Sequence, residues 1–95
     1  DEIRGRTADE TPHTVVAQVS LGYEKDNKTI QTELVSRTPR LRDLVRKFFT
    51  EKTAAELRPR YEEELKAELK ERINRVLTQG KIEEVIFLEF NVIEF

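Results

Sequence analysis

The hydrophobic pattern is clearest between Pro59 and Gly80, where apolar residues recur with the spacing of an α-helix. At about 100° per residue they fall on one arc of the helix surface. The residues on this arc are Tyr61, Leu65, Leu69, Ile73, Val76 and Leu77. Proline suits a first helical position, and glycine can take the left-handed conformation that ends a helix. The pattern therefore predicts an amphipathic helix that begins at Pro59, ends at Gly80 and covers a sheet.

The polar face of this helix carries acid–base pairs at i, i+4 spacing. They are Glu62 with Lys66, Glu68 with Arg72, and Glu71 with Arg75. Each such pair stabilises a helix by about 0.2 to 0.5 kcal/mol. We expect these charges to support the helix rather than to form a site.

Two alternating stretches precede the helices. Between Thr14 and Glu24 every second residue is apolar, which predicts a strand with one buried face. A weaker alternation follows from Thr29 to Ser36, and the turn formers at 25–28 join the two stretches into a predicted antiparallel hairpin. Gly22 predicts a bulge or a close backbone approach, unless it is simply a small residue in the strand.

Two shorter helices are expected before Pro59. Thr38 is a candidate N-cap and Pro39 a first helical residue. The apolar positions that follow have helical spacing, and they are Leu41, Leu44, Val45, Phe48 and Phe49. Thr53 and Glu56 have the spacing of a capping box, which predicts a helix of one or two turns through Leu57.

The C-terminal stretch after Gly80 predicts a strand that is apolar on both faces. Simple alternation places Ile86, Leu88, Phe90 and Val92 on one face and Val85 and Phe87 on the other. Such a strand lies inside its sheet or contacts a partner. The element order is ββαααβ, so the fold class is a two-layer α/β (α+β) domain. We expect a mainly antiparallel sheet with helices on one face and with the last strand beside the first.

Composition limits the size and class of the protein. The chain has 95 residues, 38% of them charged, a net charge of −2 and no cysteine. These values describe one small folded domain without disulfides or thiolate metal sites. Residues 1–13 are polar and predict a flexible leader, and residues 14–95 predict the folded domain. Because the chain has no methionine and begins with Asp1, we expect it to derive from a longer precursor.

Catalytic chemistry has little support in the sequence. His13 is the only histidine and lies in the polar leader, without the partners that a metal shell or a triad needs. The acidic runs at 62–64 and 83–84 lack apolar surroundings that would shift a pKa, and no glycine-rich phosphate loop is present. We predict no enzyme activity, no cofactor, no metal and no small-molecule substrate.

Basic residues gather on and just before the first predicted helix. They are Arg37, Arg40, Arg42, Arg46 and Lys47. One interpretation is the solvated back of an amphipathic helix; another is a docking face for a protein, and a third is a nucleic-acid site. Because the net charge is −2, the chain as a whole is not attracted to nucleic acid. We therefore expect that nucleic acid is not a partner.

Two blocks of sequence carry a resemblance to a known family. The first is TPRLRDLVRKFFTEKTAAEL, 38–57, with Pro39 and the Lys52–Thr53 pair. The second is INRVLTQGKIEEVIFLEFNV, 73–92, in which Asn74, Leu77 and Gly80 lead into the strand residues Val85, Phe87, Glu89 and Phe90. Together they resemble the periplasmic C-terminal domain of the flagellar basal-body protein FliL. Asn91 and Ile93 depart from the residues usual in that family, which affects the edge of the last strand and not the fold.

The resemblance implies a fold similar to the stomatin-type (SPFH) domain and a transmembrane helix upstream of Asp1. It also implies a periplasmic domain of a single-pass inner-membrane protein at the flagellar basal body, with the 13-residue leader as the tether. The expected partners are further copies of the chain in a ring and the MotA/MotB stator, whose active state the ring would stabilise to support torque and motility. The alternative is a stomatin-like membrane scaffold unrelated to flagella.

Charge complementarity suggests how neighbouring copies meet. The basic residues Arg40, Arg42 and Arg46 would face acidic residues of the next copy. We expect those acidic residues to be Glu62, Glu63 and Glu64.

Overall fold

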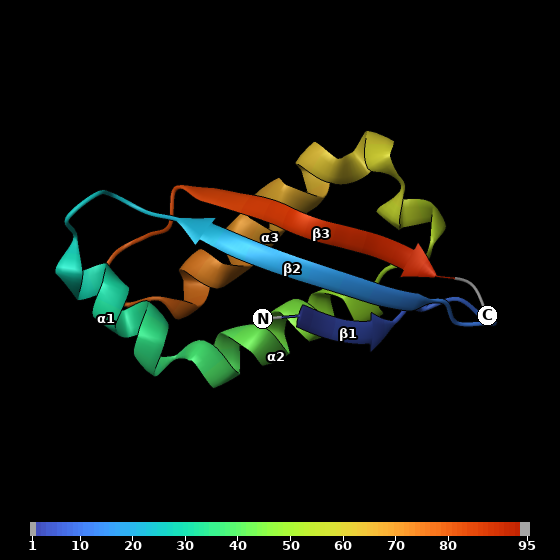
Figure 1. The fold of residues 1–95 in the computed structure, drawn as a ribbon, viewed down its shortest axis with the longest axis horizontal. Coiled ribbons are helices and arrows are strands. Elements are labelled where there is room, and N and C mark those ends of the chain that lie inside the picture. Colours follow the sequence, from blue (N-terminus) through green and yellow to red (C-terminus); the bar gives the residue numbers. More distant parts are fainter. Residues whose placement is uncertain (1, 94–95) are drawn as a thin grey trace.

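The structure, a computed structural model, describes residues 2–93, so Asp1, Glu94 and Phe95 lie outside the described residues. In chain order its elements are the strands β1 (Glu2–Arg6) and β2 (Thr14–Gly22), the helices α1 (Lys28–Ser36) and α2 (Thr38–Thr50), the 3₁₀ helices η1 (Ala55–Leu57) and η2 (Pro59–Tyr61), the helix α3 (Glu62–Val76) and the strand β3 (Glu84–Ile93). The strands form an antiparallel sheet in the order β1-β2-β3, and α2 and α3 pass behind it (Figure 1). The predicted two-layer fold class is confirmed.

The last strand pairs with the strand that begins at Thr14, as predicted. β3 runs antiparallel to β2, with Ala17 opposite Phe90 and Leu21 opposite Val85. β2 is therefore the central strand, and β3 is an edge strand. Of the two alternatives predicted for this strand, a place inside the sheet is wrong for the described residues 2–93, and contact with a partner stays a prediction.

A β-bulge in β3 changes which of its side chains share a face. Gln18 lies opposite Glu89, but its neighbour Val19 lies opposite Phe87, so Leu88 is an extra residue. The rings of Phe87 and Phe90 accordingly lie 5.1 Å apart, on the same side of the sheet. The prediction that placed them on opposite faces is wrong, because simple alternation does not count the extra residue.

Gly22 is not the site of the bulge. It lies opposite Glu84, and a Cβ atom at Gly22 would come within 3.2 Å of the Glu84 Cβ. Of the alternatives predicted for Gly22, the bulge is wrong, and the tight contact at this position is with the Glu84 side chain rather than with backbone atoms.

The hydrophobic core lies between the sheet and the helices. Its most completely buried large side chains are Phe48, Phe49, Ile30, Leu69, Ile73, Ile82 and Val15. The ring of Phe49 contacts those of Phe48, Phe87 and Phe90, with centroid distances of 5.4 to 6.1 Å. This aromatic group joins α2 to the bulged strand, because the bulge turns both β3 rings toward the helix.

The predicted second strand, Thr29 to Ser36, is instead the helix α1. Asn27 caps it, because its side-chain oxygen accepts a hydrogen bond from the Ile30 N–H over 3.1 Å. Ile30 and Leu34 are four residues apart, a spacing that fits one helix face as well as one strand face. The hairpin prediction is wrong because this short stretch does not distinguish the two periods.

Part of the predicted flexible leader is the strand β1. Its residues Glu2 to Arg6 pair with Gln18 to Thr14 of β2, and Ile3 is buried in the core. The connecting loop is also fixed, because the Ala8 N–H donates to the Lys52 carbonyl and the Ala54 N–H to the Asp9 carboxylate. The folded domain therefore starts before Thr14, and the boundary predicted at residue 13 is corrected.

The ends of the long helix differ from the prediction. Pro59 opens η2, α3 begins at Glu62, and the helix ends at Val76 because Leu77 is extended. No described glycine has a positive φ, so Gly80 is not the left-handed cap. Gly80 instead packs against Ile30, which a Cβ atom at this position would approach to 3.6 Å.

Side-chain contacts at the helix ends and on the polar face of α3 agree in part with the prediction. The three predicted i, i+4 ion pairs of α3 are all present. The capping box is confirmed, since the Thr53 N–H donates to the Glu56 carboxylate and the Glu56 N–H to the Thr53 hydroxyl. Thr38 is not an N-cap: its hydroxyl donates to the Leu34 carbonyl, although Pro39 does lie in the first turn of α2.

Candidate protein-interaction surfaces

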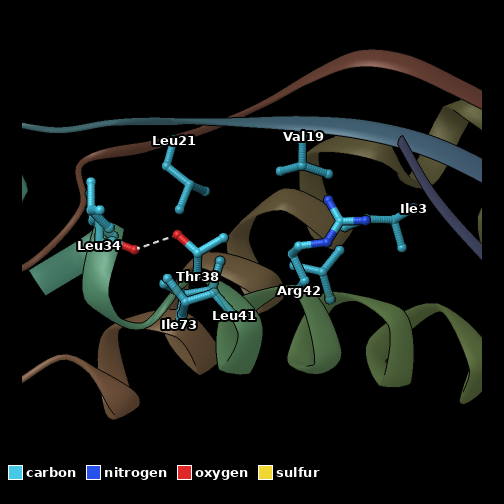
Figure 2. A pocket seen from close by; sticks show the side chains of 10 residues that line it. Ile3, Val19, Leu21, Leu34, Thr38, Leu41, Arg42 and Ile73 are labelled. Atoms are coloured by element: carbon cyan, nitrogen blue, oxygen red, sulfur yellow. Dashed lines mark hydrogen bonds between the residues drawn. The ribbon is translucent and has the colours of Figure 1, made fainter. Parts of the chain in front are cut away.

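An apolar cavity of about 290 Å³ opens beside the N-terminal strand. Figure 2 shows Val19 and Leu21 of β2 pointing into it from the sheet, with Leu34 of α1 and Leu41 of α2 on the helical side. Ile3 of β1 closes one end. The cavity was not predicted, because its lining comes from elements that are far apart in the sequence.

Arg42 lies at the edge of this cavity and binds the backbone of β1. Its guanidinium donates a hydrogen bond of 2.9 Å to the Glu2 carbonyl oxygen, and Figure 2 shows the group beside Ile3. Arg42 was predicted to face a neighbouring copy. In the structure it holds the N-terminal end of β1 against α2.

The other two basic residues of the predicted interface are exposed on α2. Arg46 passes close to β1, since a Cβ atom at Gly5 would lie 3.6 Å from the Arg46 Cγ. Arg40 lies in the first turn of the helix. Of the three arginines, Arg40 is therefore the one best placed to meet a partner.

The predicted acidic residues occupy the first turn of α3, where the helix dipole favours negative charge. Glu62 is half-buried and lies 3.5 Å from the Lys66 ammonium, whereas the side chain of Glu63 is 89% exposed. Glu64 is exposed beside them. Within one copy the starts of α2 and α3 lie at separate ends of the helical layer (Figure 1), so the structure does not bring the two charged sets together.

Glu33 forms a buried carboxylate clamp that was not predicted. Its oxygens accept hydrogen bonds from the Thr78 N–H and hydroxyl, the Gln79 N–H and the Arg37 guanidinium, over 2.8 to 3.0 Å. Burial would raise its pKa, but the hydrogen bonds from Thr78, Gln79 and Arg37 outweigh burial and hold the pKa at about 2. The clamp ties α1 to the segment after α3.

A helical interpretation of residues 28–36 could have found Glu33. On a helix, Glu33 follows Ile30 by three residues and therefore shares its buried face. A carboxylate on the buried side of an amphipathic helix signals a buried partner. A strand interpretation places Glu33 on the face opposite to Ile30 and Leu34, where a carboxylate would be solvated and would give no such signal.

Asn74 joins the end of α3 to the start of β3. Its side-chain amide donates to the Ile82 carbonyl oxygen, and its side-chain oxygen accepts from the Ile82 N–H, over 3.2 and 2.8 Å. The side chain thus pairs with Ile82 as a neighbouring strand would. Asn74 is one of the residues that carry the family resemblance. In the structure its side chain stabilises the fold by holding the backbone of Ile82.

Exposed apolar side chains gather on β3. Ile86, Ile93 and especially Leu88, which is 66% exposed, are solvent-accessible. The bulge explains Leu88, because the extra residue does not turn toward the core. This part of the edge strand is a second candidate contact surface.

The titratable residues do not assemble a metal centre among residues 2–93, where no group of three or more such side chains has suitable geometry. His13 lies in the β1–β2 loop, and its backbone N–H donates to the Thr7 hydroxyl. These residues connect the loop to the sheet.

Comparison with known proteins identifies the family. The family model for "Flagellar basal body-associated protein FliL" matches residues 3–92. The chain belongs to the FliL family. In this FliL-family chain, residues 2–93 contain no helix that is both long and apolar enough to cross a bilayer.

Three relatives, each described as "Flagellar protein FliL", support the assignment. The protein of Treponema pallidum is 43% identical over 97% of this chain and 51% of its own length. That of Borreliella burgdorferi is 38% identical over 99% of this chain and 52% of its own length. That of Aquifex aeolicus is 36% identical over 81% of this chain and 48% of its own length. The chain thus spans about half the length of these relatives.

Proposed function

We propose that this FliL-family chain is a non-enzymatic component of the flagellar basal body that assembles into a ring around the MotA/MotB stator. The observation that carries the proposal is the family match over residues 3–92. It favours a flagellar role over a stomatin-like scaffold unrelated to flagella. A ring that binds the active stator more tightly than the inactive one shifts the population toward the active state.

The proposal includes a membrane anchor. A transmembrane helix upstream of Asp1 holds the domain in the periplasm, on the outer side of the inner membrane. Because β1 begins at Glu2 and pairs with β2, residues 2–6 belong to the domain rather than to a tether. The tether is therefore formed by residues that precede Asp1.

The charged residues supply a head-to-tail contact between copies. Arg40 at the start of α2 and Glu63 at the start of α3 lie at separate ends of the helical layer (Figure 1). A contact between different surfaces on neighbouring copies generates a ring when the rotation closes. Opposite charges at such a contact select the register.

Deletion of the gene tests the functional proposal. The strain should still build filaments but swim less well, most visibly under high load, because fewer stators remain active at each motor. The measurements are torque of tethered cells and the number of stators per motor. Unchanged torque and stator occupancy would contradict the proposal.

Charge reversal tests the proposed contact. We expect Arg40→Glu or Glu63→Arg alone to reduce ring occupancy at the motor, and the double variant to restore it, because the two charges attract again after the exchange. Ring occupancy is measured by imaging motors in cells. Lys25→Glu, a matched charge change in the exposed β2–α1 turn, serves as the control and should leave occupancy unchanged. A double variant no better than either single variant would exclude the pairing.

A further inference from the structure

The central strand β2 extends beyond its partner β1. β1 pairs with Thr14 to Gln18, and within residues 2–93 no strand pairs with Val19 to Gly22 on that side of β2. Backbone N–H and C=O groups along an open strand edge can pair with an additional strand. The sheet therefore has room for one further stretch in line with β1.

The apolar cavity lies at this open edge. Val19 and Leu21 point into it from β2, and Ile3 borders it where β1 begins (Figure 2). Val35 of α1, which is 71% exposed, also lines the cavity. An extended segment along Val19–Gly22 would cover these side chains and remove apolar surface from water.

We propose that the residues preceding Asp1 in the full-length protein continue β1 along β2 and cover the cavity. This inference rests on the proposed function, because it takes the upstream anchor and tether from it. The relatives are about twice as long as the matched region, so the family has sequence from which such a segment can come.

The register specifies the pairing. Because Glu2 lies opposite Gln18 in an antiparallel pair, the residue immediately before Asp1 falls opposite Ser20, and the one before that falls opposite Leu21. Ile3 faces the core, and side chains alternate between the faces of a strand. The second residue before Asp1 therefore faces the cavity and is expected to be apolar.

The geometry favours a segment of the same chain over a second copy or a partner. Arg42 holds the Glu2 carbonyl at the cavity's edge, so β1 is fixed with its N-terminal end directed along the open part of β2 (Figure 1). A covalently continued segment has a high effective concentration at that edge. A strand from another molecule would first have to displace it.

A disulfide tests the register in the full-length, membrane-reconstituted protein. The 95-residue chain contains no cysteine, so Ser20→Cys can be combined with a cysteine placed immediately before Asp1. Mild oxidation should give an intramolecular disulfide in most molecules, because opposed residues on neighbouring strands have suitable Cβ separations. The matched control moves the upstream cysteine one residue further from Asp1, to the other face, and should remain largely reduced. A disulfide between molecules, or none, would overturn the inference.

Hydrogen exchange provides a test without substitutions. The amides of residues 19–22 that face the open edge should exchange about tenfold or more slowly in the full-length protein than in residues 1–95 alone. Equal rates would overturn the inference. If the amides of residues 19–22 exchange equally fast in a full-length protein that is anchored in the membrane, the inference of a continued strand fails and the proposed function stands. If the edge is protected but membrane fractionation finds no anchor, the anchor in the proposed function fails instead.

Discussion

Glu33 shows how a single buried carboxylate can hold two distant segments together. Its bonds to Thr78 and Gln79 join residues that lie 45 and 46 positions apart. The segment after α3 has no regular helix or strand up to β3, so its backbone N–H groups need partners of this kind. The carboxylate supplies them as a helix cap would.

We expect Glu33→Gln to lower the free energy of unfolding at neutral pH, because an amide cannot accept with both polar atoms. The pKa of Glu33 is about 2 in the folded chain against an ordinary value of 4.5. The ionised Glu33 side chain therefore contributes fully to the free energy of unfolding above about pH 4.5, and this contribution is lost as the pH falls toward 2. Urea unfolding at pH 7 and at pH 3 should show a smaller difference between wild type and variant at pH 3.

The control for this prediction is Glu71→Gln, which alters an exposed acid on α3. Its effect on the urea midpoint should be small at either pH, because exposed ion pairs contribute little. If Glu33→Gln lowers the free energy of unfolding by the same amount at pH 7 and at pH 3, the ionised Glu33 carboxylate does not stabilise the fold as proposed.

Asn74→Ala tests the other supporting side chain. It should lower the free energy of unfolding by about 1 to 3 kcal/mol, because the N–H and C=O of the buried residue Ile82 lose their partners. Asn91→Ala, which removes an exposed amide from β3, should change it by less than about 0.5 kcal/mol. Both values can be measured by urea unfolding; similar losses in the two variants would argue against the proposed role of Asn74.

Among the elements, the sequence identifies α2, α3 and β2 because each has a regular hydrophobic period. It identifies β3 because this stretch is rich in β-branched and aromatic residues, although its alternation is interrupted by the bulge. α1 was mistaken for a strand because Ile30 and Leu34 fit both periods, and the deciding cap at Asn27 is a local side-chain contact. β1 was missed because it has five residues and one buried aliphatic, Ile3. Its strand conformation comes from pairing with β2, a contact that its own residues do not encode.

Deletion of Leu88 tests the element-scale role of the bulge. Without the extra residue, regular alternation keeps Val85, Phe87, Phe90 and Val92 on the core face. Deletion of Leu88 should therefore keep the aromatic contacts and change the free energy of unfolding by about 1 kcal/mol or less. Deletion of Ile86, which lies opposite Ser20 in the regularly paired part of β3, would instead turn Val85 or Phe87 away from the core face and should lower the free energy of unfolding by about 3 kcal/mol or more. Thermal or urea unfolding distinguishes these outcomes, and equal losses in the two deletion variants would contradict the bulge at Leu88.

At the scale of the whole molecule, the domain is an elongated slab of 42 × 25 × 20 Å. Arg40 and Glu63 are exposed on the polar faces of α2 and α3, as the helical periodicity predicts. The use of Arg42 within the fold and the cavity beside it could not be predicted, because both depend on where β1 lies. The identity of partner surfaces likewise depends on contacts between separate molecules.

Assembly is expected to depend on the membrane. The isolated 95-residue domain should sediment as a monomer at micromolar concentration, because single head-to-tail contacts are weak and confinement by an anchor raises the effective concentration. Analytical ultracentrifugation of the domain and imaging of the reconstituted full-length protein test this prediction. A stable ring of the isolated domain would show that confinement is unnecessary.

The bulge at Leu88 also bears on the solubility of the domain. β3 is a ten-residue edge strand with several exposed apolar side chains, a combination that can template fibrils. The extra residue interrupts the regular edge and divides it into two shorter stretches, neither of which offers a foreign strand a long, flat surface. The bulge that keeps both aromatic side chains of β3 in the core thus also protects the outer edge of the sheet against aggregation.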